Sequence, residues 1–427
     1  MNPKLITAIA ALAAFLLPQA VASAQNAGKR PTPTSPAFLA KHFPKGKLRP
    51  GAARVINDAQ IDANIDASVT GDARAKLRFV MRKLRPQDRD NVTIVLPNGR
   101  IFANRAGLAA RTYIMRPVAG KPNTFLDDQG REVHTPAATA APRRASLSSA
   151  AFLAFRSSPA SVAAVNPPDP TGGDTGPFHR VYSNVGYSFG SANIDLPCQA
   201  GQMDPSYETG NVYLGGWGQT YSASDAGVVH SSVYDGSVDD NWALLFKENH
   251  AAHSESVSLT RRFQCGQTAT ITFYAVDGDG TITESDPNDP NALIIDNMLV
   301  LNIQGIWNDG TSGSTSQVIY TPNTEWDSSG AGDMIKRMTT IAQSSGFQTN
   351  SDGAAFGYDP VYLGPFINWS AAQIGNNSSG VPWSTLYTGG YQDWLIGGPG
   401  APDPSTYVFA TVTAADTDES DGIYLHT

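Results

Sequence analysis

Short runs rich in β-branched and aromatic residues recur after residue 176, and Gly, Asn, Asp, Ser and Pro separate them. Helical periodicity is nearly absent from this region, so we expect short strands. The expected strands cover 181–189, 211–217, 225–230, 241–247, 256–263, 268–276, 292–303, 316–321, 334–343, 366–375 and 406–414. In 268–276, Ile271 and Phe273 alternate with Thr272 and Tyr274, which predicts two different faces. About a dozen strands without helices predict a mainly β protein with a β-sandwich or jelly roll.

The region before it has mixed patterning. Apolar residues at helical spacing predict a helix over 72–84. The runs 91–97 and 100–104 flank Asn98-Gly99, a sequence typical of a hairpin with a two-residue turn. Further strands are expected in 109–118 and 124–133, so we expect a small α+β domain here.

Charge divides the chain in two. Residues 26–165 carry 23 basic and 9 acidic residues, whereas residues 166–427 carry 6 basic and 29 acidic residues and all seven tryptophans. An Ala/Ser/Pro-rich stretch joins these regions. We therefore predict a basic prosegment-like domain at 25–134, a linker at 135–176 and an acidic β-sandwich at 177–427. The expected partner of the prosegment is the acidic domain on the same chain. Two alternatives stay open: the basic residues bind an external polyanion, or they serve only solubility.

The first 24 residues have the pattern of a secretory signal peptide. Lys4 precedes an apolar run over 5–17, and Ala22-Ser23-Ala24 has the form of a cleavage site. We expect a soluble secreted or periplasmic protein that binds neither membrane nor nucleic acid. In such a compartment Cys198 and Cys265 are expected to pair, with two buried free thiols as the alternative. The bond would stabilise the fold by about 4 kcal/mol for a loop of roughly 70 residues.

Several short motifs resemble one family of secreted enzymes. They are Gly215-Gly216-Trp217, Asp225-Ala226-Gly227-Val228, Asn241-Trp242, the stretch 336–375 and the near-terminal 394–400. Their order resembles the concanavalin-like β-sandwich of the glutamic peptidases, the eqolisins and neprosins, which are secreted with an N-terminal prosegment. The resemblance covers about 200 residues, on the scale of one domain.

This resemblance implies candidate site residues. Asp225 stands where the family has a catalytic Gln or Glu. The second catalytic slot holds no obvious Glu, and Gln343 is the candidate for it, with Gln348 and Asp352 as the other nearby polar residues. The family mechanism needs a carboxylate to activate water and an amide or second acid to hold the oxyanion. Trp217 and Trp242 are the expected substrate-binding residues.

Metal sites receive little support. Asp277, Asp279 and Asp286 lie in an acidic run that suits Ca²⁺, although Ile282 stands where an EF-hand needs Gly, and a solvated acidic hairpin is the other interpretation. His250 and His253 lie in a polar segment that favours an exposed loop over zinc. No metal is expected in the catalytic site.

The leading functional hypothesis is a secreted, zymogen-like hydrolase that acts on polypeptide in acid. A non-catalytic lectin-like module that binds extracellular or cell-wall polysaccharide is the alternative, and a structural secreted protein is a third. No G-x-S-x-G or H-E-x-x-H motif points to another hydrolase class.

One prediction concerns maturation. The linker composition and the pair Arg143-Arg144 indicate sensitivity to proteases. We expect the stable secreted form to begin between about residue 140 and about residue 180. N-terminal sequencing of protein from culture checks this, and an active species that begins at Gln25 would contradict it.

Overall fold

The structure is a computed structural model, and all of its described residues belong to the second of two compact units, His42–Thr427. The described residues are 54–96, 101–105, 107–109, 112–117, 124–126, 132–134, 178–198, 208–219, 223–230, 241–248, 255–278, 297–321, 325–343, 362–394, 407–409 and 419–425. Among them, no helix has the length and apolar character needed to cross a membrane.

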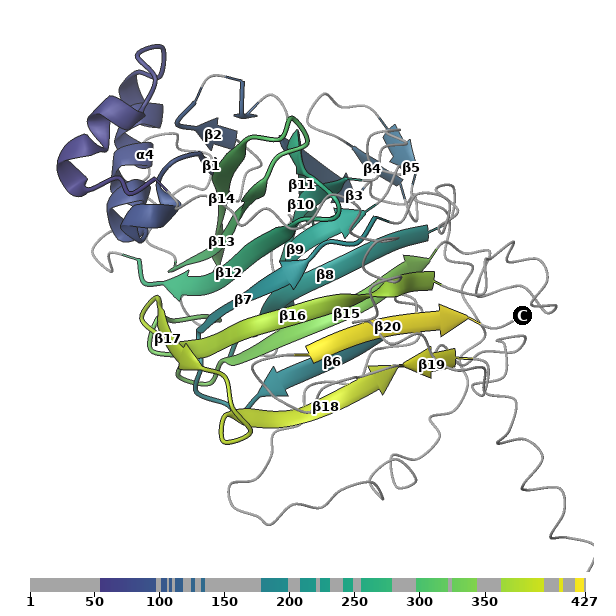
Figure 1. Ribbon diagram of the computed structural model, residues 1–427. Helices are drawn as coiled ribbons and strands as arrows, with labels where there is room; N and C mark the ends of the chain where they lie inside the picture. Colours follow the sequence, from purple (N-terminus) through teal and green to yellow (C-terminus); the bar gives the residue numbers. More distant parts are fainter. Residues whose placement is uncertain are drawn as a thin grey trace, which may run out of the picture. The chain divides into compact units, whose positions relative to one another are not determined.

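The described chain is mainly β and forms two large sheets (Figure 1). Sheet A has the order β19 (Tyr407–Phe409), β20 (Glu419–Leu425), β16 (Tyr362–Asn376), β7 (Phe189–Asp195), β12 (Thr268–Val276), β13 (Asn297–Ile306), β14 (Ser312–Thr321), β1 (Val92–Val95) and β2 (Ile101–Ala103), with β17 (Ser379–Pro382) paired to β16. Sheet B has the order β18 (Thr388–Trp394), β6 (Phe178–Ser183), β15 (Met334–Gln343), β8 (Glu208–Trp217), β9 (Ala223–His230), β10 (Trp242–Glu248), β11 (Glu255–Phe263), β3 (Thr112–Pro117), β4 (Thr124–Leu126) and β5 (Glu132–His134).

The two sheets pack face to face over one apolar core. Strand alternation places Ile271 and Phe273 of β12 in this core, while Tyr274 points to the other side of sheet A, as the sequence predicts. Across the core, the ring centroids of Phe273 and Phe246 of β10 lie 6.2 Å apart. This arrangement is consistent with a β-sandwich.

The N-terminal segment contains the predicted helix and hairpin. Helix α4 (Gly71–Lys83) agrees with the prediction for 72–84 to within a residue, and three short 3-10 helices surround it: η1 (Asp58–Gln60), η2 (Asp62–Asn64) and η3 (Pro86–Asp88). Strands β1 and β2 pair antiparallel, with Ile94 opposite Phe102.

This segment also joins both sheets. Strand β1 runs parallel to β14, with Val92 opposite Ser316, and β3 runs antiparallel to β11. The sequence predicts a separate small domain at 25–134, and that boundary stays a prediction. The described pairings nevertheless place its strands at an edge of each sheet.

One expected strand differs in the structure, and the expected disulfide is present. The expected strand 181–189 is divided, because β6 ends at Ser183 and β7 begins at Phe189, with Gly186 at φ +117° in the turn between them. The predicted disulfide between Cys198 and Cys265 is present, with the two Cα atoms 4.9 Å apart.

A buried ion pair joins the two sheets. Arg337 of β15 donates to Glu419 of β20 at 2.7 Å, and Nε2 of His179 lies 2.9 Å from the other carboxylate oxygen. The Arg337 guanidinium also lies 5.3 Å from the ring centroid of Trp383. Because Arg337 and Glu419 are nearly inaccessible to water, their ion pair compensates two charges that solvent does not reach.

We therefore predict that Glu419→Ala lowers the free energy of unfolding by about 3–5 kcal/mol, because it leaves the Arg337 charge buried without its carboxylate. Urea unfolding followed by tryptophan fluorescence measures this. Leu386→Ala, at a side chain that is 74% exposed, is the control and should change stability by less than about 0.5 kcal/mol. Equal stability of Glu419→Ala and wild type would show that the ion pair contributes nothing.

Candidate functional site

Asp225 lies near the middle of sheet B. The register places Asp225 of β9 opposite Gly215 of β8, and Gly215 opposite Lys336 of β15. Because the neighbouring Ala226, Leu214 and Ile335 point into the core, alternation directs Asp225 and Lys336 to the outer face of sheet B.

Gly215 allows these two side chains to meet across the strand between them. Its φ is +148°, and a Cβ there would come within 2.0 Å of the Ser224 carbonyl oxygen. With no side chain on the central strand, the Lys336 ammonium forms an ion pair with Oδ1 of Asp225. The Asp225 side chain keeps 18% of its accessible surface and that of Lys336 only 4%.

Trp217 lies beside this pair, two residues from Gly215 on the same face. Its ring centroid is 4.8 Å from the Lys336 ammonium and 4.8 Å from the Arg180 guanidinium, so it contacts two cations. Trp217 is 2% exposed. The ring therefore holds Lys336 and Arg180 next to Asp225 rather than presenting a face to solvent.

Charge controls the protonation of both groups. Burial raises the pKa of Asp225, but the positive charges of Lys336, Lys247 and Arg180 outweigh burial and hold its pKa below the ordinary value. Burial lowers the pKa of Lys336, and the Asp225 carboxylate offsets only part of that effect. The carboxylate therefore stays ionised to lower pH than an isolated Asp.

The concentration of cations here is unusual for this chain. Residues 166–427 contain only six Lys and Arg, and three of them surround Asp225. Sequence reasoning found Asp225 and Trp217 but missed Lys336 and Arg180. Both lie in strands, on the side away from the core, and their rarity in this region was the available signal.

The structure does not bring Asp225 and Gln343 together. Gln343 is the last residue of β15 and pairs with Glu208, seven residues along the strand from Lys336. Seven residues of strand span about 23 Å. Among the described residues, the group that contacts the Asp225 carboxylate is the Lys336 ammonium, and Gln348 and Asp352 lie outside the described residues.

Trp242 occupies a different environment from the expected one. It is 0% exposed in the core between the sheets, and its indole nitrogen donates to the Pro197 carbonyl at 3.0 Å. The predicted substrate contact stays a prediction, and the structure places this side chain between the sheets, where it has no accessible surface. Alternation accounts for this, since Ala243 and Leu245 point to the other side of β10.

The calcium expectation stays untested. Asp279 and Asp286 lie outside the described residues, and Asp277 accepts hydrogen bonds from the backbone nitrogen and hydroxyl of Ser328, both at 2.7 Å. Within the described part of the chain, no group of three or more His, Cys, Asp or Glu residues is arranged to hold a metal.

Asp333 is buried near the acidic side chains of Asp277, Glu325 and Asp327. One carboxylate oxygen accepts a hydrogen bond from the Asp327 backbone nitrogen at 3.2 Å. Burial, together with the charges of Asp327, Glu325 and Asp277, raises the pKa of Asp333 to about 8. Asp333 is therefore protonated at neutral pH.

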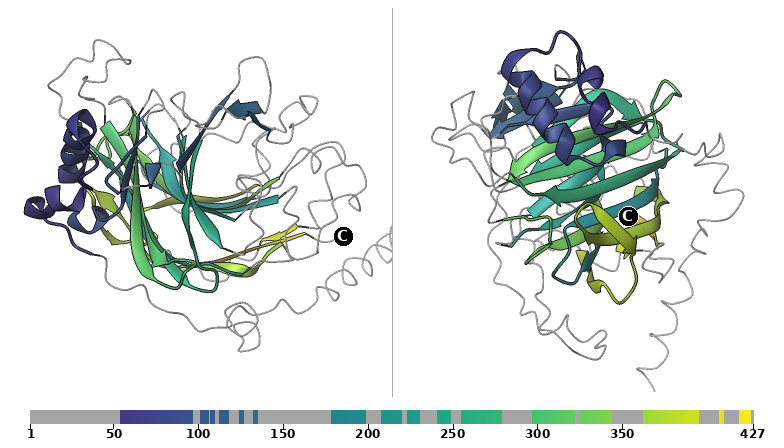
Figure 2. Two further views of the ribbon diagram at one scale, coloured as in Figure 1. Left: turned by 90° about the horizontal axis from the view of Figure 1, so that it is seen from above. Right: turned by 90° about the vertical axis from the view of Figure 1, so that its left-hand side faces the viewer.

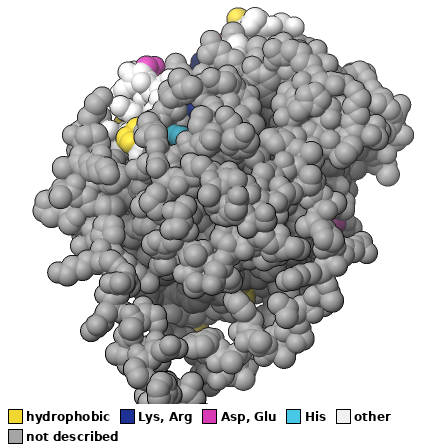
Figure 3. All heavy atoms as spheres, turned by 90° about the vertical axis from the view of Figure 1, so that its right-hand side faces the viewer, with side chains coloured by type: hydrophobic (Ala, Val, Ile, Leu, Met, Phe, Trp, Pro, Cys, Tyr) yellow, Lys and Arg dark blue, Asp and Glu magenta, His cyan; other side chains and the backbone are white. Residues whose placement is uncertain are grey.

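Figure 3 shows the side of the molecule opposite helix α4 in Figure 1. Most of this view is occupied by residues outside the described part of the chain, and only a few described side chains of different kinds are visible in it. The candidate site in the described residues is the outer face of sheet B, because three of the six Lys and Arg residues of 166–427 surround Asp225 there.

Comparison with solved structures gives a remote likeness. No family model matches the chain, and no curated protein matches it. Among solved structures the chain is similar to SCP-B, a member of the eqolisin family of peptidases, in a complex with the tripeptide Ala-Ile-His. The identity is 9%, the TM-score is 0.32, and the match covers 58% of this chain and 99% of that one. This likeness identifies neither an activity nor a substrate.

We predict a pH effect of Asp333 on stability. Its carboxyl holds a proton in the folded state up to about pH 8, whereas an unfolded Asp loses it near pH 4. The stabilisation is complete below about pH 4 and is lost by about 1.4 kcal/mol per pH unit as the pH rises toward 8. In urea unfolding at several pH values, Asp333→Asn should remove this slope. Parallel pH dependences of the variant and wild type would contradict the assignment.

Proposed function

We propose that this chain is a secreted hydrolase that cleaves polypeptide in acid, with Asp225 as the residue that activates water. The observation that carries the proposal is the ionised Asp225 carboxylate, held next to the Lys336 ammonium across Gly215 on the outer face of sheet B. A carboxylate beside a fixed positive charge supplies the two groups that hydrolysis of an amide requires.

The proposed reaction uses these two side chains in turn. Asp225 accepts a proton from a water molecule as the water oxygen attacks the carbonyl carbon of the peptide bond. The Lys336 ammonium stabilises the negative charge that develops on the carbonyl oxygen. Asp225 then gives its proton to the leaving nitrogen as the carbon–nitrogen bond breaks, which restores the carboxylate.

The electrostatics favour activity in acid. Lys336, Lys247 and Arg180 hold the pKa of Asp225 below its ordinary value, although burial acts in the opposite direction. The base is therefore available at a pH where most carboxylates are protonated. Lys336 is fixed by the Trp217 ring, which supports its role in holding the oxyanion.

Exposed tryptophans would be one platform for the glycan-binding alternative. Six of the seven tryptophans have described side chains, and none of these is more than 3% exposed. Stacking on a sugar ring requires an accessible aromatic face. These side chains offer no such platform, so the peptidase is the function that we propose.

The test is hydrolysis of an unfolded protein by the purified full chain between about pH 2 and pH 7. Asp225→Asn should lower the rate by about a hundredfold or more, because the amide cannot accept the proton from water. Lys336→Met should lower the rate and move the acid limb of the pH profile upward, because Asp225 loses its nearest cation.

Asp309→Asn is the matched control, because Asp309 is an exposed carboxylate in the turn between β13 and β14. It should cleave at the wild-type rate. Tryptophan fluorescence establishes that each variant is folded. An inactive wild type, or an Asp225→Asn variant as active as the wild type, would disprove the proposed chemistry.

A further inference from the structure

Sheet A is apolar on both faces. Its inner face packs against sheet B, and its outer face carries a second set of buried side chains. These are Phe189, Tyr274, Val276, Met298, Val300, Val318 and Tyr320, none more than 7% exposed. An apolar sheet face of this size needs a cover in water.

The cover is the N-terminal segment, residues 54–105. Leu77, Val80 and Met81 of helix α4 are 0% exposed and belong to the same apolar cluster as the outer face of sheet A. Ile94 of β1 and Phe102 of β2 belong to it as well. Figure 2 shows the helical part of this segment against the sheet that contains β12, β13 and β14.

Polar groups fix this contact at two places. Asp88 accepts a hydrogen bond from the Tyr274 hydroxyl at 2.9 Å, and the Arg85 side chain donates to the same carboxylate at 2.6 and 3.1 Å. Burial and Asp88 raise the pKa of Tyr274 well above its ordinary value, so the hydroxyl keeps its proton. The Arg85 guanidinium lies 5.4 Å from the ring centroid of Phe189 and 5.1 Å from that of Tyr274.

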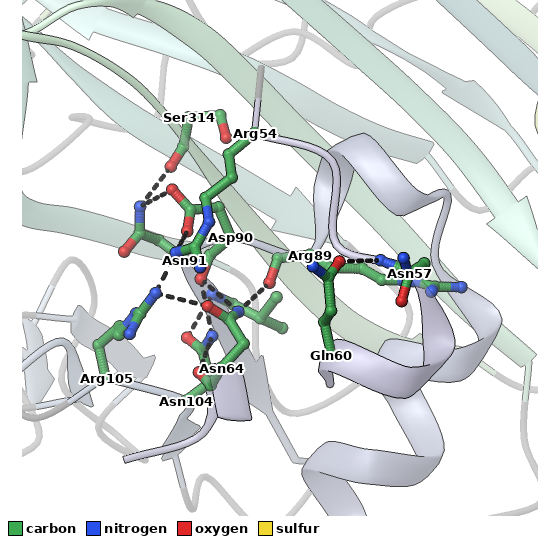
Figure 4. Close-up of polar contacts among 11 residues, drawn as sticks. Arg54, Asn57, Gln60, Asn64, Arg89, Asp90, Asn91, Asn104, Arg105 and Ser314 are labelled. Atoms are coloured by element: carbon green, nitrogen blue, oxygen red, sulfur yellow. Dashed lines mark hydrogen bonds and ion pairs between the residues drawn. The ribbon is translucent and has the colours of Figure 1, made fainter. Parts of the chain in front are cut away.

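The second place is the β1–β14 junction. Asn91 donates to the Ser314 carbonyl at 2.8 Å (Figure 4), and the Ser316 hydroxyl donates to the Asp88 carbonyl at 2.6 Å. Four residues of β1, from Val92 to Val95, pair in register with β14. Backbone pairing and buried hydrogen bonds of this kind do not depend on net charge.

Among the described contacts between residues 54–105 and the acidic region after residue 166, apolar packing and hydrogen bonds therefore predominate over ion pairs. The ion pairs described for residues 54–105 join partners inside the segment, such as Arg89 with Asp58 and Lys76 with Asp72. The segment also covers sheet A, whereas Asp225 lies on the outer face of sheet B. Its described part does not block the candidate site.

We infer that residues 54–105 are a permanent structural part of the sandwich, so that cleavage within 135–176 produces a two-chain protein instead of releasing a prosegment. This replaces the expectation from the sequence that the stable secreted form begins only after the linker, because N-terminal sequencing of a two-chain protein finds the N-terminal chain as well. The outer face of sheet A is the docking surface, and this segment is its occupant. The inference does not rest on the proposed hydrolase activity.

The experiment uses the full chain with a recognition sequence for a site-specific protease inserted between Arg143 and Arg144. After complete cleavage, size-exclusion chromatography at about 0.05 M and about 1 M NaCl should give one peak that contains both fragments. Separation of the fragments in either native buffer overturns the inference, and separation at high salt alone would identify a charge-driven contact instead.

Urea titration of the cleaved protein provides a second measurement. All seven tryptophans lie after residue 166, so their fluorescence reports on the larger fragment alone. Loss of the small fragment should coincide with unfolding of the larger one. Dissociation at lower urea, with tryptophan fluorescence still native, would show that the sandwich does not need its cover.

A matched pair of variants on helix α4 tests the apolar contact. Leu77→Ala should shift both urea midpoints to lower concentration, whereas Arg82→Ala, at an exposed position on the same helix, should leave both unchanged. Should Leu77→Ala fail to fold, Tyr274→Phe gives the same comparison, because it removes the hydroxyl that donates to Asp88 and accepts from the Arg85 backbone nitrogen, both within the covering segment. If a folded Leu77→Ala or Tyr274→Phe variant has the same urea midpoints as the wild type, the inference is contradicted.

Discussion

Burial of sheet A on both faces is the constraint on which the rest of the structure depends. Nearly every residue of β13 is buried, because one face packs against sheet B and the other lies under residues 54–105. A strand of this kind cannot face water on either side. The N-terminal segment is therefore required for the fold that supports the candidate site, although it lies on the other side of the sandwich from Asp225.

Sheet B meets a different requirement. Its inner face is apolar like that of sheet A, and its outer face carries a small buried apolar cluster together with a carboxylate and several of the few cations of the acidic region. The backbone makes this possible, because Gly215 leaves room for Asp225 and Lys336 to form an ion pair across β8. The outer face of sheet A therefore packs against residues 54–105, and the outer face of sheet B carries the polar site around Asp225.

Local patterns predicted much of the fold. Alternation in β12 predicted its two faces, helical spacing predicted α4, and two lone cysteines predicted their bond. The parallel pairing of β1 with β14 was not predictable, because no local pattern states which distant edge a strand will join. The partner of Asp225 was missed for the same reason. Lys336 lies more than a hundred residues away in sequence, and only the strand order brings it near.

Native-state hydrogen exchange, followed by mass spectrometry on the uncleaved chain, tests most directly whether the segment and the sandwich form one cooperative unit. If they do, amides of α4 and β1 open with the same free energy as those of β13, because none can exchange before global unfolding. Exchange of α4 and β1 that is many-fold faster than that of β13 would show that the segment detaches independently, and would contradict this account.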